Sequence, residues 1–157
     1  MNATPAPASL HAELSLAARI LILVIFAVSG IRKIVEFPVF VAFIASKGLP
    51  FPEACAILAA VLEIGGTVLL VVGWKTRQTA LVLTVYTLFL AFVFHNFWNL
   101  QTGNMTPVQA SNQMNHFLKN ISIAGGLLLL AALGPGAWSV DMRSKKTAGP
   151  KLSPLKT

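Results

Sequence analysis

Charged side chains are scarce in this sequence. Asp, Glu, Lys and Arg make up 11% of the 157 residues, whereas a soluble domain usually carries about 25%. Hydrophobic residues make up 55%, and the mean hydropathy is +0.73. The shortage of charge excludes an ordinary soluble domain, and the length fits one small membrane domain.

Cysteine and the usual cofactor motifs are also lacking. Cys55 is the single cysteine, so an internal disulfide and a cysteine-ligated iron–sulfur cluster are both excluded. The sequence has no two-histidine arrangement for haem on facing helices and no glycine-rich nucleotide loop after a strand. It predicts no metal site. A redox role would therefore need a quinone or a partner subunit to carry the electrons.

Acidic residues are also few, five against twelve basic ones, which gives a formal net charge of +7. Such a charge can indicate nucleic-acid binding, but here the cations lie between or beyond apolar runs. Basic flanks beside apolar runs are typical of membrane topology signals. We therefore expect a lipid bilayer, and no nucleic acid, as the partner of this charge.

Four apolar runs are long enough to cross a membrane as helices. They cover about residues 14–34, 54–74, 78–98 and 114–134, and roughly 20 apolar residues span the hydrocarbon core of a bilayer. The apolar segment 37–46 is too short to cross, which predicts an interfacial or re-entrant helix. The sequence thus predicts an all-α integral membrane protein, a four-helix bundle with a short segment between its first two spans.

The four spans make up one domain, residues 14–140, between a disordered lead (1–13) and a flexible basic tail (141–157). Both termini lie on one side, together with Lys75, Arg77 and five tail cations, whereas fewer cations lie on the other. The positive-inside rule then places the termini in the cytoplasm. In a bacterium, the protein would be a multi-pass protein of the inner (plasma) membrane.

Glu63 is the most unusual residue, because it lies in the middle of the second apolar run. An acidic residue at the centre of a membrane helix costs about 3 kcal/mol, so Glu63 needs a partner or a proton. The small residues on its helical face let another helix approach closely; they are Ala56, Ala59, Ala60 and Gly66. We therefore expect a partner for Glu63 on one of the other spans.

Each of the other spans carries polar residues. Arg19 and Lys33 share one face of the first span with Gly30, although each alone fits a side chain that extends to the headgroups. His95 and Trp98 end the third span, where a histidine beside a tryptophan is also typical of an interfacial anchor. Lys119 and Asn120 lie in the first turns of the fourth span.

Together these residues predict an intramembrane polar cluster of Arg19, Lys33, Glu63, His95, Trp98, Lys119 and Asn120. Lys119 lies roughly one to one and a half turns from Glu63 in depth, so we expect Lys119 to be its partner. Ionisable groups inside a membrane indicate a functional site. The alternative is a buried ion pair between Glu63 and Lys119 that only sets the helix register.

Several short motifs follow one another along residues 14–140. They are Arg19, Gly30-Ile31-Arg32-Lys33, Gly48-Leu49-Pro50-Phe51-Pro52, Glu63-Ile64-Gly65-Gly66 with Gly73, Phe94-His95-Asn96-Phe97-Trp98, Phe117-Leu118-Lys119-Asn120, Gly125-Gly126 and Gly134-Pro135-Gly136. In this order and spacing the chain resembles the DoxX family of small four-span membrane proteins. The resemblance implies the four-helix membrane fold and a membrane subunit of quinone-linked redox systems. Named members include the small subunit of a thiosulfate:quinone oxidoreductase and a membrane partner of thiol-stress enzymes.

Three functional hypotheses follow. The first is a membrane subunit or partner of a quinone-linked oxidoreductase, whose cavity binds a quinone headgroup or a small oxyanion. In this hypothesis Lys119 and His95 would donate hydrogen bonds to the quinone, and Glu63 would relay a proton. Trp98 and Phe94 would stack on the quinone ring. The second is a non-catalytic scaffold for a soluble partner. The third is a small transporter component, which would need to form an oligomer. The sequence assigns no catalytic residue and leaves open whether the chain alone is an enzyme.

Overall fold

The computed structural model describes residues 8–98 and 106–147, and within these ranges the chain is helical without strands. Four helices are long and apolar enough to cross a membrane. This confirms the all-α four-helix membrane bundle with a short helix between its first two spans. The six helices are α1 (Ala8–Val35), α2 (Phe37–Ser46), α3 (Pro52–Val72), α4 (Thr76–Phe94), α5 (Pro107–Leu133) and α6 (Val140–Thr147).

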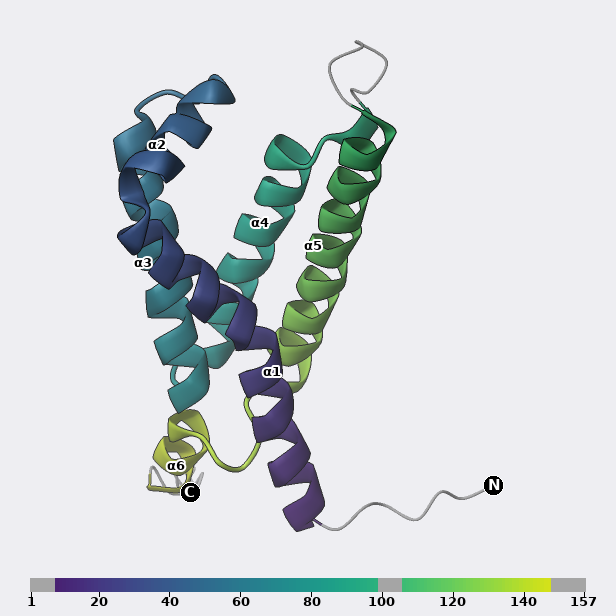
Figure 1. Cartoon of the computed structure of the whole chain (residues 1–157). Helices are drawn as coiled ribbons and strands as arrows, with labels where there is room; N and C mark the ends of the chain where they lie inside the picture. Colours follow the sequence, from purple (N-terminus) through teal and green to yellow (C-terminus); the bar gives the residue numbers. More distant parts are fainter. Residues whose placement is uncertain (1–7, 99–105, 148–157) are drawn as a thin grey trace, which may run out of the picture.

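The four long helices pack as two pairs, α1 along α3 and α4 along α5. Figure 1 shows these pairs close together at the end that carries α6 and further apart at the end that carries α2. We call these the α6 end and the α2 end. The short helix α2 packs on α3 and turns the chain back into the bundle. This divergence leaves room between the pairs at the α2 end.

The main core explains why the α6 end is closed. Its buried apolar side chains come from all four long helices; they are Leu23, Phe26, Leu70, Ala80, Leu83, Leu127 and Ala131. At the α2 end the buried cluster is smaller and contains Ile44, Ala56 and Phe94. Large apolar side chains on the outside of the bundle, such as Leu21, Val85 and Leu129, are exposed. They face the lipid, as the outer surface of a membrane bundle requires.

Two glycines permit close approach of helices. A Cβ atom added at Gly66 would lie 2.9 Å from Cδ1 of Leu83, so Gly66 lets α3 and α4 pack closely. A Cβ atom at Gly30 would lie 2.7 Å from Cγ1 of Ile64 and 3.2 Å from Cβ of Glu63. Gly30 therefore brings α1 against the part of α3 that carries the buried acid.

Several helix boundaries differ from the expected ones, and α4 ends at Phe94 rather than near residue 98. α1 begins at Ala8 rather than near residue 14, because the intervening residues are good helix formers. α5 begins at Pro107 rather than near residue 114, because Thr106 and Gln109 form a capping box. Part of the expected flexible tail forms α6. The remainder of the expected lead and tail (1–7 and 148–157) lies outside the described residues.

Helix α6 is held by Asp141, whose carboxylate accepts hydrogen bonds from the backbone N–H groups of Lys75 and Thr76, each at 2.9 Å. These N–H groups lie at the start of α4, where the helix dipole favours a negative charge. The contact fastens the chain after α5 to the α3–α4 turn. Together with the main core, this contact stabilises the close packing at the α6 end.

Candidate functional site

Glu63 is buried, with 2% of its surface exposed, and it pairs with Lys33 of α1. The Lys33 ammonium group lies 2.9 Å from Oε1 and 2.8 Å from Oε2 of Glu63. The Tyr86 hydroxyl donates a third hydrogen bond to Oε1 at 2.7 Å. The expectation that Lys119 pairs with Glu63 was therefore wrong. Depth along the spans had indicated Lys119, but the close approach of α1 to α3 at Gly30 brings Lys33 to Glu63 instead.

Lys33 is itself held on several sides. Its ammonium group donates to the Ser29 hydroxyl at 2.6 Å and lies 4.7 Å from the centre of the Phe40 ring. All of its strong contacts therefore come from α1, α2 and α3. A buried ion pair is tolerated only when further hydrogen bonds satisfy it. Ser29 and Tyr86 supply these bonds here.

The ion pair forms one wall of a cavity between the two helix pairs, with a volume of about 180 Å³. The cavity brings together five of the seven residues that the sequence predicted as a cluster: Lys33, Glu63, His95, Lys119 and Asn120. The rest of its wall is mostly apolar and includes the aromatic rings of Phe40, Phe43 and Phe94. The result is a small chamber with polar groups on several sides and rings between them.

His95 and Lys119 lie on the wall opposite the ion pair. Nδ1 of His95 lies 2.9 Å from the amide oxygen of Gln113, so in this arrangement Nδ1 carries the proton and Nε2 can accept a hydrogen bond. The ring of His95 stacks on His116, with centroids 5.1 Å apart. Lys119 donates to Nδ1 of His116 at 3.2 Å.

Burial and the neighbouring cations explain why His95 is neutral, because both lower its pKa. His95 follows the last residue of α4. Burial lowers its pKa below the ordinary value, and the hydrogen bond with Gln113 offsets part of this shift. The positive charges of Lys119 and Lys47, and electrostatic repulsion from His116 when it is protonated, lower the pKa further. His95 is therefore a neutral base at pH 7.

Lys119 is the cation of the cavity that is not neutralised by an acid. Two ion pairs lie near the cavity and its mouth, and they join Lys33 to Glu63 and Arg32 to Glu36. Neither involves Lys119, whose side chain is exposed to the chamber and its mouth. The cavity therefore presents one free positive charge to a ligand.

Arg19 and Trp98 lie apart from the cavity. Arg19 is 1% exposed and donates to the backbone carbonyls of Leu70 (3.2 Å), Val71 (3.3 Å) and Trp138 (2.7 Å). It thus satisfies the last carbonyls of α3 at the α6 end. Arg19 and Lys33 do share a face of α1, but they lie fourteen positions apart along the helix, a distance of about 21 Å.

Trp98 packs in an aromatic cluster outside the chamber. Its ring lies 5.5 Å from that of Phe117 and 6.1 Å from that of Phe92, measured between centroids. Trp98 is also half exposed. These contacts place it where an interfacial tryptophan is expected, at the end of a membrane helix.

Four further residues belong to the site although the sequence did not single them out: Ser29, Tyr86, Gln113 and His116. Tyr86 is the one tyrosine of the chain, and a tyrosine inside a membrane span needs a partner for its hydroxyl. The capping box at Thr106 is the sequence signal that could have identified Gln113 and His116. It places the start of α5 two turns earlier than expected, so both residues lie within the helix. Steps of three and four then place them on the face of Asn120.

Comparisons with known proteins agree with this architecture. The family model described as DoxX matches residues 14–96, more than half of the chain. The chain belongs to the DoxX family. The DoxX match includes Arg19, Lys33, Glu63 and His95 and ends before α5. No solved structure matches the chain.

DoxX relatives extend the similarity over most of the chain. It is 41% identical over 130 residues to Inner membrane protein YphA of Escherichia coli, covering 83% of this chain and 89% of the relative. It is 38% identical over 127 residues to Inner membrane protein YqjF of the same organism, covering 80% of this chain and 88% of the relative. A more distant relative is the Surfeit locus protein 4 homolog of Drosophila melanogaster, 37% identical over 79 residues, which cover 50% of this chain and 28% of that protein. The chain is an integral membrane protein of DoxX type.

Proposed function

We propose that this protein binds the headgroup of a membrane quinone in the cavity and serves as the membrane subunit or partner of a quinone-linked oxidoreductase. The observation that carries the proposal is a chamber of ring size, lined by aromatic side chains and by hydrogen-bonding groups, inside a four-helix membrane bundle. Small-molecule sites are typically concave and mostly apolar with a few placed polar groups.

The size of the chamber supports a single ring. Its volume is about 180 Å³, and a cavity of about 150 Å³ in a protein core can hold benzene. Phe43 and Phe94 lie with their ring centroids 5.5 Å apart on its wall. Aromatic rings at such distances favour a further ring against them.

The polar groups supply both donors and an acceptor. The ammonium group of Lys119 and the side-chain amide of Asn120 would donate to a quinone oxygen, while Nε2 of neutral His95 would accept from the hydroxyl of the quinol. Glu63 already accepts three hydrogen bonds. In this proposal it holds Lys33 in place and does not relay protons. A bound quinone would supply a two-electron, two-proton couple, with the electrons exchanged with a redox cofactor of the partner subunit.

The same proposal places the protein in a bacterial inner membrane, since two relatives are named as inner membrane proteins. The α6 end carries Lys75 and Arg77, and further cations follow in the tail. The positive-inside rule puts this end in the cytoplasm. The α2 end, where the cavity lies, would then face the periplasm.

Quinone binding can be tested with purified protein in lipid nanodiscs. We expect saturable binding of a benzoquinone, weakened by about tenfold or more in Lys119→Met because a charged donor is lost. Lys75→Met removes an exposed cation at the opposite end and is the matched control. Glu63→Gln is compared in the same way with Glu53→Gln as its matched control, because Glu53 is an exposed acid on the same helix. Wild-type protein without saturable binding, or equal binding in Lys119→Met and Lys75→Met, would reject the proposal.

One observation favours a second candidate, a small oxyanion in the same chamber. The positive charge of Lys119 has no neutralising carboxylate in the described part of the chain, and an oxyanion would supply that charge. Sulfate or phosphate added to the quinone titration separates the two candidates. Saturable sulfate binding in wild-type protein that binds no quinone would replace the first proposal by the second.

A further inference from the structure

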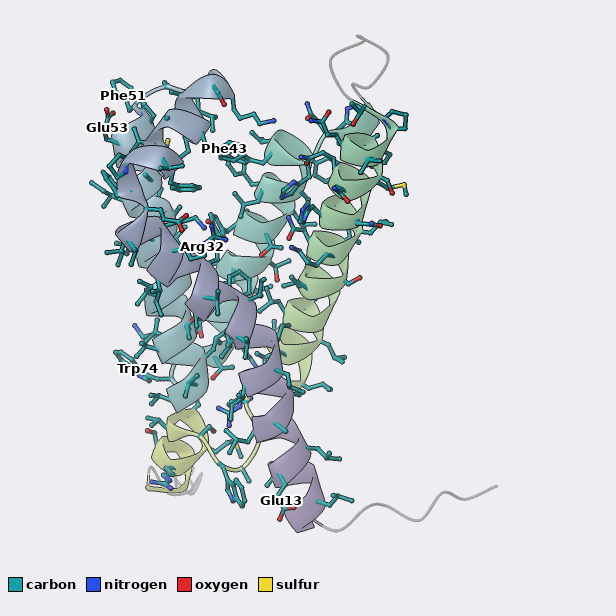
Figure 2. The ribbon with its side chains drawn as sticks, viewed as in Figure 1. Glu13, Arg32, Phe43, Phe51, Glu53 and Trp74 are labelled. Atoms are coloured by element: carbon teal, nitrogen blue, oxygen red, sulfur yellow. The ribbon has the colours of Figure 1, made fainter. Side chains whose placement is uncertain are left out.

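The cavity adjoins a groove on the outside of the bundle, with a volume of about 540 Å³. The groove lies between α1 and α2 on one side and His95 and the start of α5 on the other. Ser29, Lys33 and Lys119 line both the cavity and the groove, so the two spaces adjoin each other. Figure 2 shows Arg32 and Phe43 on the edge of α1 and α2 that faces α4 and α5, where the groove opens.

The groove reaches deep into the part of α1 that crosses the membrane. Ile25 and Val28 line its inner part, and they lie about 15 Å and 10 Å from the end of α1 at Val35. Half a hydrocarbon core is about 15 Å thick, so Ile25 lies near the bilayer centre. Both side chains are open to the outside, with 39% and 52% of their surface exposed. At this depth the surroundings are lipid chains.

The two ends of the groove differ in polarity. Its outer part is lined by Arg32 and Glu36, which form a salt bridge of 2.9 Å, and by His116. Below the groove α1 and α5 approach closely, since Cδ1 of Ile22 would lie 2.7 Å from a Cβ atom at Gly126. One turn beyond this contact the two helices separate, and the groove begins at Ile25.

We propose that the cavity is loaded sideways from the bilayer through this groove, by an amphiphile whose ring occupies the chamber and whose isoprenoid tail lies along Ile25 and Val28. This inference rests on the proposed quinone site and adds the route and the tail. An amphiphile matches a groove that is polar at the headgroup level and apolar near the bilayer centre. A small anion from water would leave the apolar part of the groove unoccupied.

The route can be tested by filling the groove. Val28→Trp places a large side chain in it, and Ile31→Trp is the matched control, because Ile31 is a similarly exposed residue of α1 that does not line the groove. In nanodiscs, we expect Val28→Trp to weaken binding of a long-chain isoprenoid benzoquinone and to slow its loading, each by about tenfold, or about 1.4 kcal/mol. Binding of a tail-free benzoquinone should stay within about twofold, as should both ligands in Ile31→Trp.

Equal effects of Val28→Trp on the two quinones, or no effect on either, would overturn the route. A wild-type protein that binds neither quinone would instead overturn the proposed function. The route is then tested without a ligand, by a small trifluoroethylthio label on Ile123→Cys in a Cys55→Ser background. Ile123 lines the cavity and not the groove. We expect nitroxide on lipid acyl chains to relax the fluorine signal more than a water-soluble gadolinium chelate does, and the reverse order would overturn the lateral route.

Discussion

Removing Lys33 tests whether the buried ion pair holds α1 to α3. In Lys33→Met the Glu63 carboxylate would keep the Tyr86 hydroxyl and lose both bonds from the ammonium group, at 2.8 and 2.9 Å. Lys33 is 8% exposed and Glu63 2% exposed, so water does not replace the lost charge. Leaving one partner of such a pair buried costs about 3–5 kcal/mol. We expect a loss of stability in this range.

The assay is a double-mutant cycle, with unfolding measured in mixed micelles by titration with a denaturing detergent. Glu63→Gln removes the charge that Lys33→Met leaves unpaired, so the double variant should recover much of the loss. We expect a coupling energy of about 2–3 kcal/mol between Lys33 and Glu63. The same cycle with Lys119→Met is the control, and its coupling to Glu63 should be below about 0.5 kcal/mol.

The reverse pattern would refute the argument. If Lys119→Met coupled to Glu63 more strongly than Lys33→Met does, the acid would be paired across the cavity and not along the α1–α3 contact. Additive effects in both cycles would show that the acid draws its stabilisation from neither lysine. Quinone binding by each folded variant, measured in parallel, separates loss of the ion pair from loss of the site.

Three further outcomes follow from the geometry. Gly73 has φ +74°, and an added Cβ atom would lie 2.5 Å from Cβ of Ser139. Gly73→Ala should therefore lower the unfolding free energy by more than about 2 kcal/mol. In the same unfolding assay, Gly65→Ala should change it by less than about 0.5 kcal/mol, because a Cβ atom at Gly65 would meet no atom within 4 Å. Arg19→Lys keeps the charge but loses the fork that reaches three carbonyls, so it should cost about 2 kcal/mol by the same measurement. Because the pKa of His95 is lowered on folding, His95 contributes full stability above its unfolded pKa of about 6.5 and destabilises the fold as pH falls below it. Its NMR titration midpoint should lie below that value, and His95→Gln should flatten the acid limb of stability against pH; a midpoint above it would contradict the burial argument.

The polar character of the cavity depends on which of its charged side chains are paired and which are not. Glu63 and Lys33 neutralise each other within the cavity wall, so their charges are structural. Lys119 and His95 are left to face the chamber, and they differ in that one is a cation and the other a neutral base. A ligand with both an accepting and a donating oxygen satisfies this pair better than a simple ion does.

Much of the candidate site was predictable because polar residues inside apolar runs are rare. Lys33, Glu63, His95, Lys119 and Asn120 line one cavity. The partner of Glu63 was not predictable in the same way. Depth along a helix can be counted at about 1.5 Å per residue, but a change of one position turns a side chain by about 100° around the axis. Which lysine faces the acid depends on how the helices are rotated and how closely they approach.

The sequence by itself determined the fold class, because four long apolar runs in a chain with little charge must cross a membrane as helices whose backbone groups are satisfied internally. It also determined which side chains would have to find partners there. Only the tertiary structure decided the pairing. Gly30 lets α1 pack closely on α3, so Glu63 pairs with Lys33. The divergence of the helix pairs leaves Lys119 facing the cavity. Arg19 lies at the closed α6 end, far from Lys33, because residues that share a helical face can still lie far apart along the helix axis.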